Sequence, residues 1–209
     1  MTAMLRIIRY AALGLSVILL GAGGYLWWQR GSIDPAAVVG GLTVAPGVSL
    51  GGPFELVDQT GRTVTERDYR GRYMLVFFGF THCPDVCPTE LQVIAEVLDK
   101  LGPRTDRVAP IFVTVDPERD TPEVMKTYVE LFDPRLIGLT GSARQIAAIA
   151  KEFRVYYAKV TPPGASDYTM DHSAFTYLIG PDGKFRALFR HGAPAEEIVR
   201  AITAGLPAA

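Results

Sequence analysis

Two almost continuously apolar segments, residues 73–80 and 108–115, each lead into a stretch whose apolar residues recur with helical spacing. A strand that is apolar on both faces is typical of the centre of a parallel sheet covered by helices on both sides. The first helix is predicted from Pro88, and the second has Thr121 as its cap and Pro122 at its first position. The chain is therefore predicted to fold around a layered α/β core.

The remaining segments complete this pattern. They are a hairpin of 54–58 and 63–65, a short strand 136–139, a helix 142–153, an extended segment 156–160, a hairpin of 174–179 and 184–189, and a last helix 195–204. The Pro- and Gly-containing stretch 161–171 is predicted to be a loop. The order β-α-β-α, then β-β-α, predicts a thioredoxin-like three-layer α/β sandwich with a mixed central sheet.

The amino terminus carries a different signal, because residues 10–28 contain no charged side chain. Nineteen residues at about 1.5 Å each are long enough to cross a hydrocarbon core of roughly 30 Å. Arg6 and Arg9 precede this segment, and the positive-inside rule puts that end in the cytoplasm. A cleaved signal peptide is the alternative, although Trp27 and Trp28 continue the apolar run past the small residues.

We therefore expect a single-pass protein of a bacterial inner membrane with its soluble domain in the periplasm. The expected boundaries are a cytoplasmic N-terminus at 1–9, a transmembrane anchor at 10–28, a Gly/Pro-rich linker at 29–53 and a thioredoxin-like domain at 54–209. Without the first 28 residues, which hold two Arg, the chain keeps nineteen basic against twenty-two acidic residues. Nucleic acid is an unsuitable partner for such a surface, because phosphate binding needs a basic one.

Cys83 and Cys87 are the only cysteines, and they lie four positions apart where the first apolar strand gives way to a helix. Backbone N–H groups at a helix start favour a thiolate, which is the form that attacks disulfides and that binds metals. Redox enzymes of the thioredoxin class space their cysteines as C-x-x-C, whereas three residues separate these two. A metal site and a redox pair both remain possible interpretations, and a plain structural disulfide is the less favoured one.

Two thiolates leave a soft metal such as Cu(I) in need of a third ligand, and imidazole suits both copper oxidation states. His82, His172 and His191 are the only histidines. His82 adjoins Cys83, and successive side chains of an extended segment point to opposite sides. We expect a solvated or capping role for His191. His172 precedes the strand predicted at 174–179, whose start should approach the cysteines, and an exposed loop histidine is the equal alternative.

Charged residues follow the second apolar strand, namely Asp116, Glu118, Arg119 and Asp120. They could offer a docking surface near the cysteines. The alternative is a solvated helix entry, since acids before a helix are favoured by its dipole.

Three separated motifs resemble those of the SCO/SenC family of membrane-anchored, thioredoxin-fold copper proteins, and the resemblance covers about residues 48–204. They are residues 79–88 (GFTHCPDVCP), 115–122 (VDPERDTP) and 171–173 (DHS). The resemblance implies that Cys83, Cys87 and His172 bind copper as Cu(I) or Cu(II). It also implies a copper chaperone, or a reductant of the target cysteines, for the binuclear copper centre of cytochrome c oxidase.

The partners expected on this basis are the oxidase subunit that carries the copper centre, a thiol reductase and another copper chaperone. The reductase is needed because an unmetallated Cys83–Cys87 pair tends to oxidise outside the cytoplasm, and a disulfide cannot bind copper through thiolates. The alternative function is a membrane-tethered thiol–disulfide reductase or redox sensor without stoichiometric copper. A chaperone is favoured over a true enzyme, with thiol–disulfide oxidoreductase activity as the enzymatic option.

Overall fold

The structure is a computed structural model in which the chain divides into two units, residues 1–35 and 36–209. The residues that it describes are 14, 16, 20–21, 50–164 and 166–206. The four described residues of the first unit are helical. No helix among the described residues has both the length and the apolar character to span a membrane. The anchor predicted at 10–28 and most of the linker predicted at 29–53 lie outside the described residues and stay predictions.

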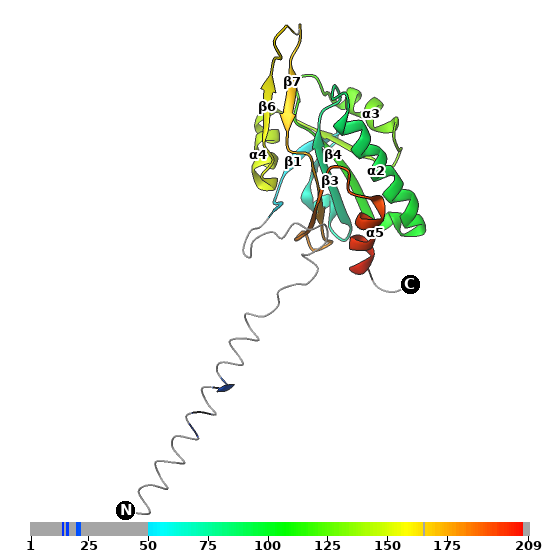
Figure 1. Cartoon of the computed structure of the whole chain (residues 1–209), viewed down its shortest axis with the longest axis vertical. Helices are drawn as coiled ribbons and strands as arrows, with labels where there is room; N and C mark the ends of the chain where they lie inside the picture. Colours follow the sequence, from blue (N-terminus) through cyan, green and yellow to red (C-terminus); the bar gives the residue numbers. More distant parts are fainter. Residues whose placement is uncertain (1–13, 15, 17–19, 22–49, 165, 207–209) are drawn as a thin grey trace, which may run out of the picture. The chain divides into compact units, whose positions relative to one another are not determined.

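A mixed seven-stranded sheet in the order β2-β1-β5-β4-β3-β8-β9 forms the centre of the second unit (Figure 1). Neighbours β3, β4 and β5 are parallel, whereas the two edges are antiparallel. The strands are β1 (Glu55–Asp58), β2 (Thr63–Thr65), β3 (Tyr73–Gly79), β4 (Val108–Thr114), β5 (Ile137–Thr140), β8 (Phe175–Ile179) and β9 (Phe185–Arg190). The predicted thioredoxin-like α/β fold with a mixed sheet is confirmed.

Helices cover both faces of the sheet, with α2, α3 and α5 on one side and α4 on the other (Figure 1). The helices are α2 (Val86–Leu101), α3 (Pro122–Glu130), α4 (Ala143–Phe153) and α5 (Ala195–Ala204). Thr121 caps α3 by accepting from the Val124 N–H, as its place before a proline predicted. Two short 3-10 helices were not predicted, η2 (Glu66–Tyr69) and η3 (Gly102–Arg107).

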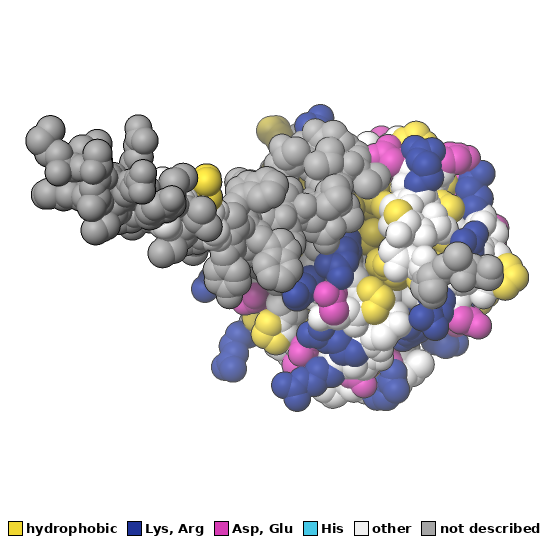
Figure 2. Space-filling view, turned by 90° about the horizontal axis from the view of Figure 1, so that it is seen from below, with side chains coloured by type: hydrophobic (Ala, Val, Ile, Leu, Met, Phe, Trp, Pro, Cys, Tyr) yellow, Lys and Arg dark blue, Asp and Glu magenta, His cyan; other side chains and the backbone are white. Residues whose placement is uncertain are grey.

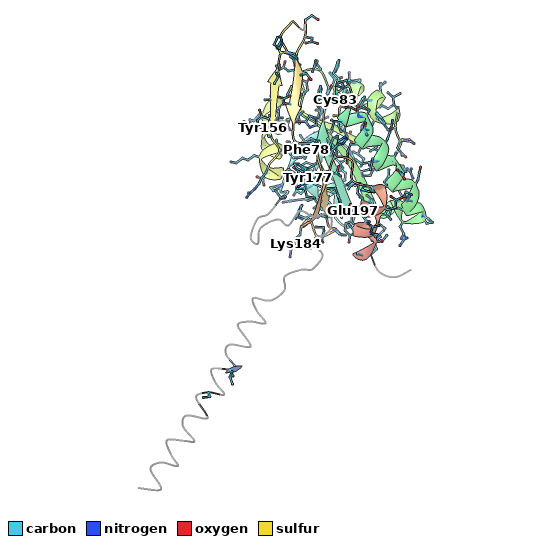
Figure 3. The ribbon with its side chains drawn as sticks, in the orientation of Figure 1. Phe78, Cys83, Tyr156, Tyr177, Lys184 and Glu197 are labelled. Carbon is cyan, nitrogen blue, oxygen red and sulfur yellow. The ribbon has the colours of Figure 1, made fainter. Side chains whose placement is uncertain are left out.

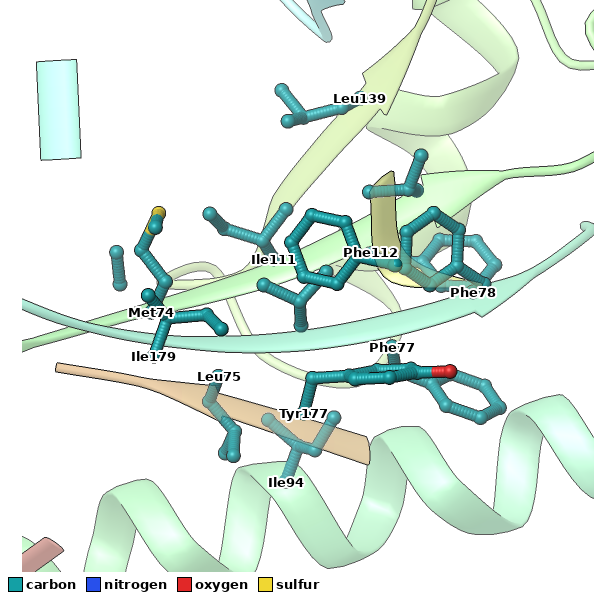
Figure 4. Close-up of a cluster of buried hydrophobic side chains, with 14 of the residues drawn as sticks. Met74, Leu75, Phe77, Phe78, Ile94, Ile111, Phe112, Leu139, Tyr177 and Ile179 are labelled. Carbon is teal, nitrogen blue, oxygen red and sulfur yellow. The ribbon is translucent and has the colours of Figure 1, made fainter. Parts of the chain in front are cut away.

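The core explains why β3 and β4 are almost entirely apolar, since all fourteen residues of the two strands are buried. Phe77 stacks on Phe112 with ring centroids 6.2 Å apart. Phe78, the next residue, contacts Phe153 of α4 at 5.3 Å on the other face. Figure 4 shows side chains from both strands filling the two layers. A strand with helices on both sides has no face exposed to water, which favours apolar residues on both faces.

A separate two-stranded sheet pairs β6 (Tyr157–Val160) with β7 (Thr169–His172) in antiparallel register, and it stands out from the body of the domain (Figure 1). The sequence predicted a loop for the whole of 161–171, so the strand β7 corrects that prediction. Its residues gain strand structure from pairing with β6, and cross-strand pairing is a tertiary effect that local composition does not reveal. In this register Tyr157 lies opposite His172.

Candidate metal centre

The cysteine turn is built where β3 ends. Cys83 N–H donates to the Phe80 carbonyl at 3.3 Å, which closes the turn, and α2 begins at Val86. This start is two residues earlier than predicted, so Cys87 lies inside the first helical turn, where its N–H donates to the Cys83 sulfur at 3.4 Å. Cys87 is fully buried and Cys83 is partly exposed. Both are free thiols.

Gly79 at the end of β3 makes room for the second sulfur. A Cβ at this position would lie 2.6 Å from the Cys87 sulfur and 2.8 Å from the Phe112 ring, both too close for ordinary contact. The glycine is therefore required by the packing of Cys87 against the strand.

Asp120 fastens the beginning of the turn to the loop after β4. Its buried carboxylate accepts from the Thr81 N–H at 3.1 Å and the Thr81 hydroxyl at 2.6 Å, and from the Thr114 hydroxyl. Burial raises the pKa of Asp120, while these hydrogen bonds act in the opposite direction. The residues before Cys83 are thus held by a network of buried polar contacts as well as by the strand.

His172 reaches the sulfurs from β7, eighty-five positions after Cys87. Its Nε2 lies 3.6 Å from the Cys87 sulfur, and its Nδ1 lies 3.1 Å from the Ser173 carbonyl oxygen. Because that oxygen can only accept, Nδ1 donates to it, and Nε2 is the ring nitrogen that faces the cysteines. The edges of Phe77 and Phe80 pack against the imidazole at centroid distances of 6.2 and 5.9 Å.

Cys83, Cys87 and His172 form the one group of potential metal ligands within the described ranges, with one donor atom from each and all three within 4.8 Å of one another. The Cys87 thiol donates to the Cys83 sulfur and lowers the pKa of Cys83 to about 3, with His172 contributing in the same direction. The pKa of Cys87 is raised, first by this contact with Cys83 and then by burial. One thiolate and one thiol therefore share the site at neutral pH.

A cavity of about 360 Å³ opens beside the cluster. It is lined by Phe80, Cys83, Pro84, Asp85, Val86, Tyr156, Thr169, Met170, Asp171, His172 and Ala174. The cluster is thus accessible from outside on the Cys83 side, while Cys87 stays enclosed. A partner can reach one sulfur without opening the core.

The other two histidines lie outside the cluster. His82 is exposed and its Nδ1 contacts the Thr81 hydroxyl at 3.1 Å. His191 is exposed, in line with the expected solvated role, and its Nδ1 also lies 3.0 Å from the buried Glu90 carboxylate, which accepts from Thr176 at 2.6 Å. Sequence reasoning missed Glu90, although its position three residues after Cys87 puts it on the apolar face of α2.

A group of side chains, which we call the latch, fastens the β6–β7 hairpin to the loop after β4. The Arg119 guanidinium lies 3.8 Å from the centroid of the Tyr168 ring and donates to the Tyr168 carbonyl at 3.1 Å. Lys159 lies over the same ring at 4.1 Å, and the Tyr168 hydroxyl donates to Asp116 at 3.0 Å. Asp116 also accepts from the Arg119 guanidinium. Cation–ring contacts of this kind stabilise by about 0.5–2 kcal/mol.

The latch changes the interpretation of the charged residues after β4. Asp116 and Asp120 are buried, and Arg119 is turned toward the hairpin, so only Glu118 of these four residues is exposed. The main contacts of Asp116, Arg119 and Asp120 are with other residues of the domain. Of the charged docking surface expected from the sequence, only Glu118 is therefore exposed to a partner. No pattern in the sequence pointed to Tyr168, because its partner lies forty-nine positions away.

The fold and the site together define a class of protein: a thioredoxin-like domain with two free cysteines at a strand-to-helix turn and a histidine brought to them by an added hairpin. Comparison with known proteins agrees. The SCO1/SenC family pattern matches residues 44–206. The chain belongs to the SCO1/SenC family.

Among its relatives is the protein sco1 of Schizosaccharomyces pombe, 46% identical over 156 residues, which are 73% of this chain and 59% of that protein. The chain thus spans a little over half the length of that relative. The solved structure of Bradyrhizobium japonicum ScoI with copper bound is 47% identical, has a TM-score of 0.70, and covers 76% of this chain and 100% of its own. The structure of BsSco, described as a member of the Sco family of cytochrome c oxidase assembly proteins with a disulfide switch, is 27% identical with a TM-score of 0.60 over 77% of this chain and 96% of its own.

Proposed function

We propose that this protein is a copper metallochaperone. Cys83, Cys87 and His172 together bind the copper ion, and the protein delivers it during assembly of the binuclear copper centre of cytochrome c oxidase. The convergence of two sulfurs and one imidazole nitrogen within 4.8 Å is the observation that carries this proposal. The donor set fits the cargo, because thiolate and imidazole ligands suit Cu(I). The solved relative with copper bound and the family's description as oxidase assembly proteins support it further.

Cys83 and His172 have different roles in the proposed transfer of copper. Cys83 is partly exposed and lines the cavity, so it is the sulfur that an incoming partner meets first. His172 belongs to a hairpin outside the main sheet, so it can withdraw without disturbing the core. Copper would then pass to the acceptor by exchange of one ligand at a time.

The proposed setting is a bacterial inner membrane, with residues 10–28 as the anchor and the domain in the periplasm. The uncharged segment of nineteen residues supports this setting. The proposed partners are the oxidase subunit that holds the copper centre, a second copper chaperone as donor, and a thiol reductase.

Copper titration of the reduced protein tests the assignment, with a chromophoric Cu(I) chelator as competitor. One copper per chain is expected, with strong weakening in Cys83→Ser and in His172→Ala. His82→Ala is the matched control, since that histidine adjoins Cys83 in sequence but lies outside the cluster. Unchanged copper affinity in His172→Ala would overturn the site.

A thiol–disulfide reductase is the second candidate, and the lowered pKa of Cys83 is the observation that favours it. Cys83 thiolate would attack a partner disulfide to form a mixed disulfide and release one partner thiolate. Cys87 would then form the Cys83–Cys87 disulfide as the second partner sulfur leaves, so that two electrons pass to the partner. If copper-free protein with His172→Ala reduced the oxidase cysteines at the normal rate, this function would be favoured over delivery.

A further inference from the structure

The domain has two ends of opposite charge. The copper end consists of the segments 80–86, 115–123 and 156–172, which together hold seven acidic residues, five of them exposed, and two basic residues. The entry end consists of the segments 66–72, 102–107 and 180–186, which together hold seven basic and four acidic residues. The entry-end segments precede β3 and β4 or join β8 to β9, while the copper-end segments follow β3 and β4 or carry the hairpin. Figure 3 shows Cys83 and Lys184 toward opposite ends of the domain.

Several entry-end cations are free. Arg104, Arg107 and Lys184 are exposed, and within the described part of the chain none of them makes an ion pair. Arg70 donates only to a backbone carbonyl, that of Asp182, so its charge is not neutralised by the contact. Figure 2 views the domain from this end and shows Lys and Arg side chains spread over the face, with fewer Asp and Glu between them.

The chain enters the domain at this same end. Gly51, Gly52 and Pro53 line a small cavity of about 100 Å³ together with Arg70 and Gly183. The Gly51 N–H also donates to the Glu152 carbonyl at 3.0 Å, and Leu50 is buried in the core. The segment that comes from the proposed anchor therefore meets the domain beside its basic face.

We propose that the entry end docks on an anionic lipid surface, so that the copper end faces away from the membrane toward its partners. Two electrostatic effects favour this orientation. Lipid phosphates attract the basic entry end, and they repel the acidic copper end. A basic residue near such a surface improves binding by about fivefold. This docking rests on the proposed membrane setting but does not require copper. Vesicle binding and copper binding can therefore be tested, and refuted, independently of each other.

Vesicle binding of an isolated domain beginning at residue 44 tests the proposal. The B. japonicum relative is matched over its whole length by 76% of this chain, so a domain of this extent folds on its own. Vesicles of pure phosphatidylcholine are compared with vesicles that also contain anionic phosphatidylglycerol, at an ionic strength of about 0.05 M to limit screening. Stronger binding to the anionic vesicles is expected. Equal binding to both would overturn the proposal.

Matched charge reversals identify the surface. The double variant Arg104→Glu and Lys184→Glu should bind the anionic vesicles at least about tenfold more weakly. The control carries Lys126→Glu and Arg190→Glu, two exposed cations outside the entry end, and has the same net charge. It should retain most of the binding, and both variants should bind copper as the parent does. Equal loss in the two variants would mean that net charge alone is responsible and would overturn the proposal.

The orientation of the domain on the vesicle can be measured by tryptophan fluorescence. Trp27 and Trp28 are the only tryptophans of the chain and both are absent from this domain, so an introduced tryptophan is its sole indole fluorophore. Pro103→Trp puts a fluorophore at the entry end and Pro163→Trp puts one at the exposed hairpin tip, and both exchanges are uncharged. Brominated lipid should quench the first and leave the second unaffected. Quenching of the hairpin tip instead would reverse the orientation and overturn the proposal.

Discussion

The two parts of the copper site are held in different ways. The cysteine turn belongs to the body of the domain, where β3, the first turn of α2 and the buried Asp120 fix it from several sides. His172 belongs to a two-stranded hairpin outside the main sheet, and the latch of Arg119, Tyr168 and Asp116 ties that hairpin to the body. The difference suggests a division between a fixed pair of sulfurs and an adjustable nitrogen.

Removing a sulfur should have the largest effect on this comparison. In Cys83→Ser and Cys87→Ser, Cu(I) affinity should fall by more than about a hundredfold, since even residues one step removed from a metal contribute 10–100-fold. Competition with a Cu(I) chelator measures this fall. If either variant kept its Cu(I) affinity within tenfold of the parent, the assignment of both sulfurs as copper ligands would be wrong.

Removing the nitrogen should weaken copper binding less than removing a sulfur. His172→Ala leaves both sulfurs in place, so Cu(I) should stay bound with affinity reduced about 10–100-fold, while the optical spectrum of the Cu(II) form should change. His82→Ala should leave both properties unaltered. An unaltered Cu(II) spectrum in His172→Ala would show that His172 is not a copper ligand.

Loosening the latch should affect copper release more than copper capacity. Arg119→Met removes the guanidinium from Tyr168 and Asp116, and release of Cu(I) to a chelator should become about tenfold faster as His172 loses its support. The stoichiometry should remain one copper per chain, and Tm should fall by only about 2–4 °C for each kcal/mol lost.

Lys126→Met is the control for the latch, because Lys126 is exposed and pairs with the exposed Glu130 of the same helix. It should change the release rate by less than about twofold, as exposed ion pairs contribute little. Equal acceleration in both variants would assign the effect to surface charge, and an unchanged rate in Arg119→Met would show that the hairpin holds without its latch.

The smallest expected effect is that of pH on the reactivity of Cys83. Its pKa is lowered to about 3, first by Cys87 and then by His172, so the thiolate is already formed at pH 5. Alkylation of the copper-free protein should therefore change less than about twofold between pH 5 and pH 8, where an ordinary thiol accelerates about tenfold per unit. Only one thiol should react quickly, since the pKa of Cys87 is raised. A rate that climbs through this range would place the Cys83 pKa in the ordinary region.

Prediction from sequence succeeded where a residue's environment follows from its neighbours along the chain. The helix at 195–204 has the predicted bounds, and β3 and β4 differ from the prediction by one residue at their ends. Strands without polar positions and a Thr-Pro helix start are local signals of this kind. The start of α2 was two residues off because Pro88 fits any position of a first turn, where backbone N–H groups lack helical partners.

Prediction was weaker where partners are distant. Thr169 to His172 carry no strong strand pattern, and β7 exists because β6 lies beside it. Glu90 and His191 are 101 positions apart, and the sequence did not predict the contact between the buried carboxylate and the exposed imidazole. Such contacts depend on how the elements pack, which their local composition does not encode.

The sequence by itself determined that two thiols share one strand-to-helix turn at the edge of an apolar α/β core, because that arrangement needs only short-range patterns. Which histidine joins them was decided by tertiary structure. His82, His172 and His191 are equally able to bind a metal as side chains, but only the hairpin, held by Arg119 and Tyr168, brings an imidazole nitrogen to within 3.6 Å of the Cys87 sulfur. Proximity between residues eighty-five positions apart is a property of the packed chain.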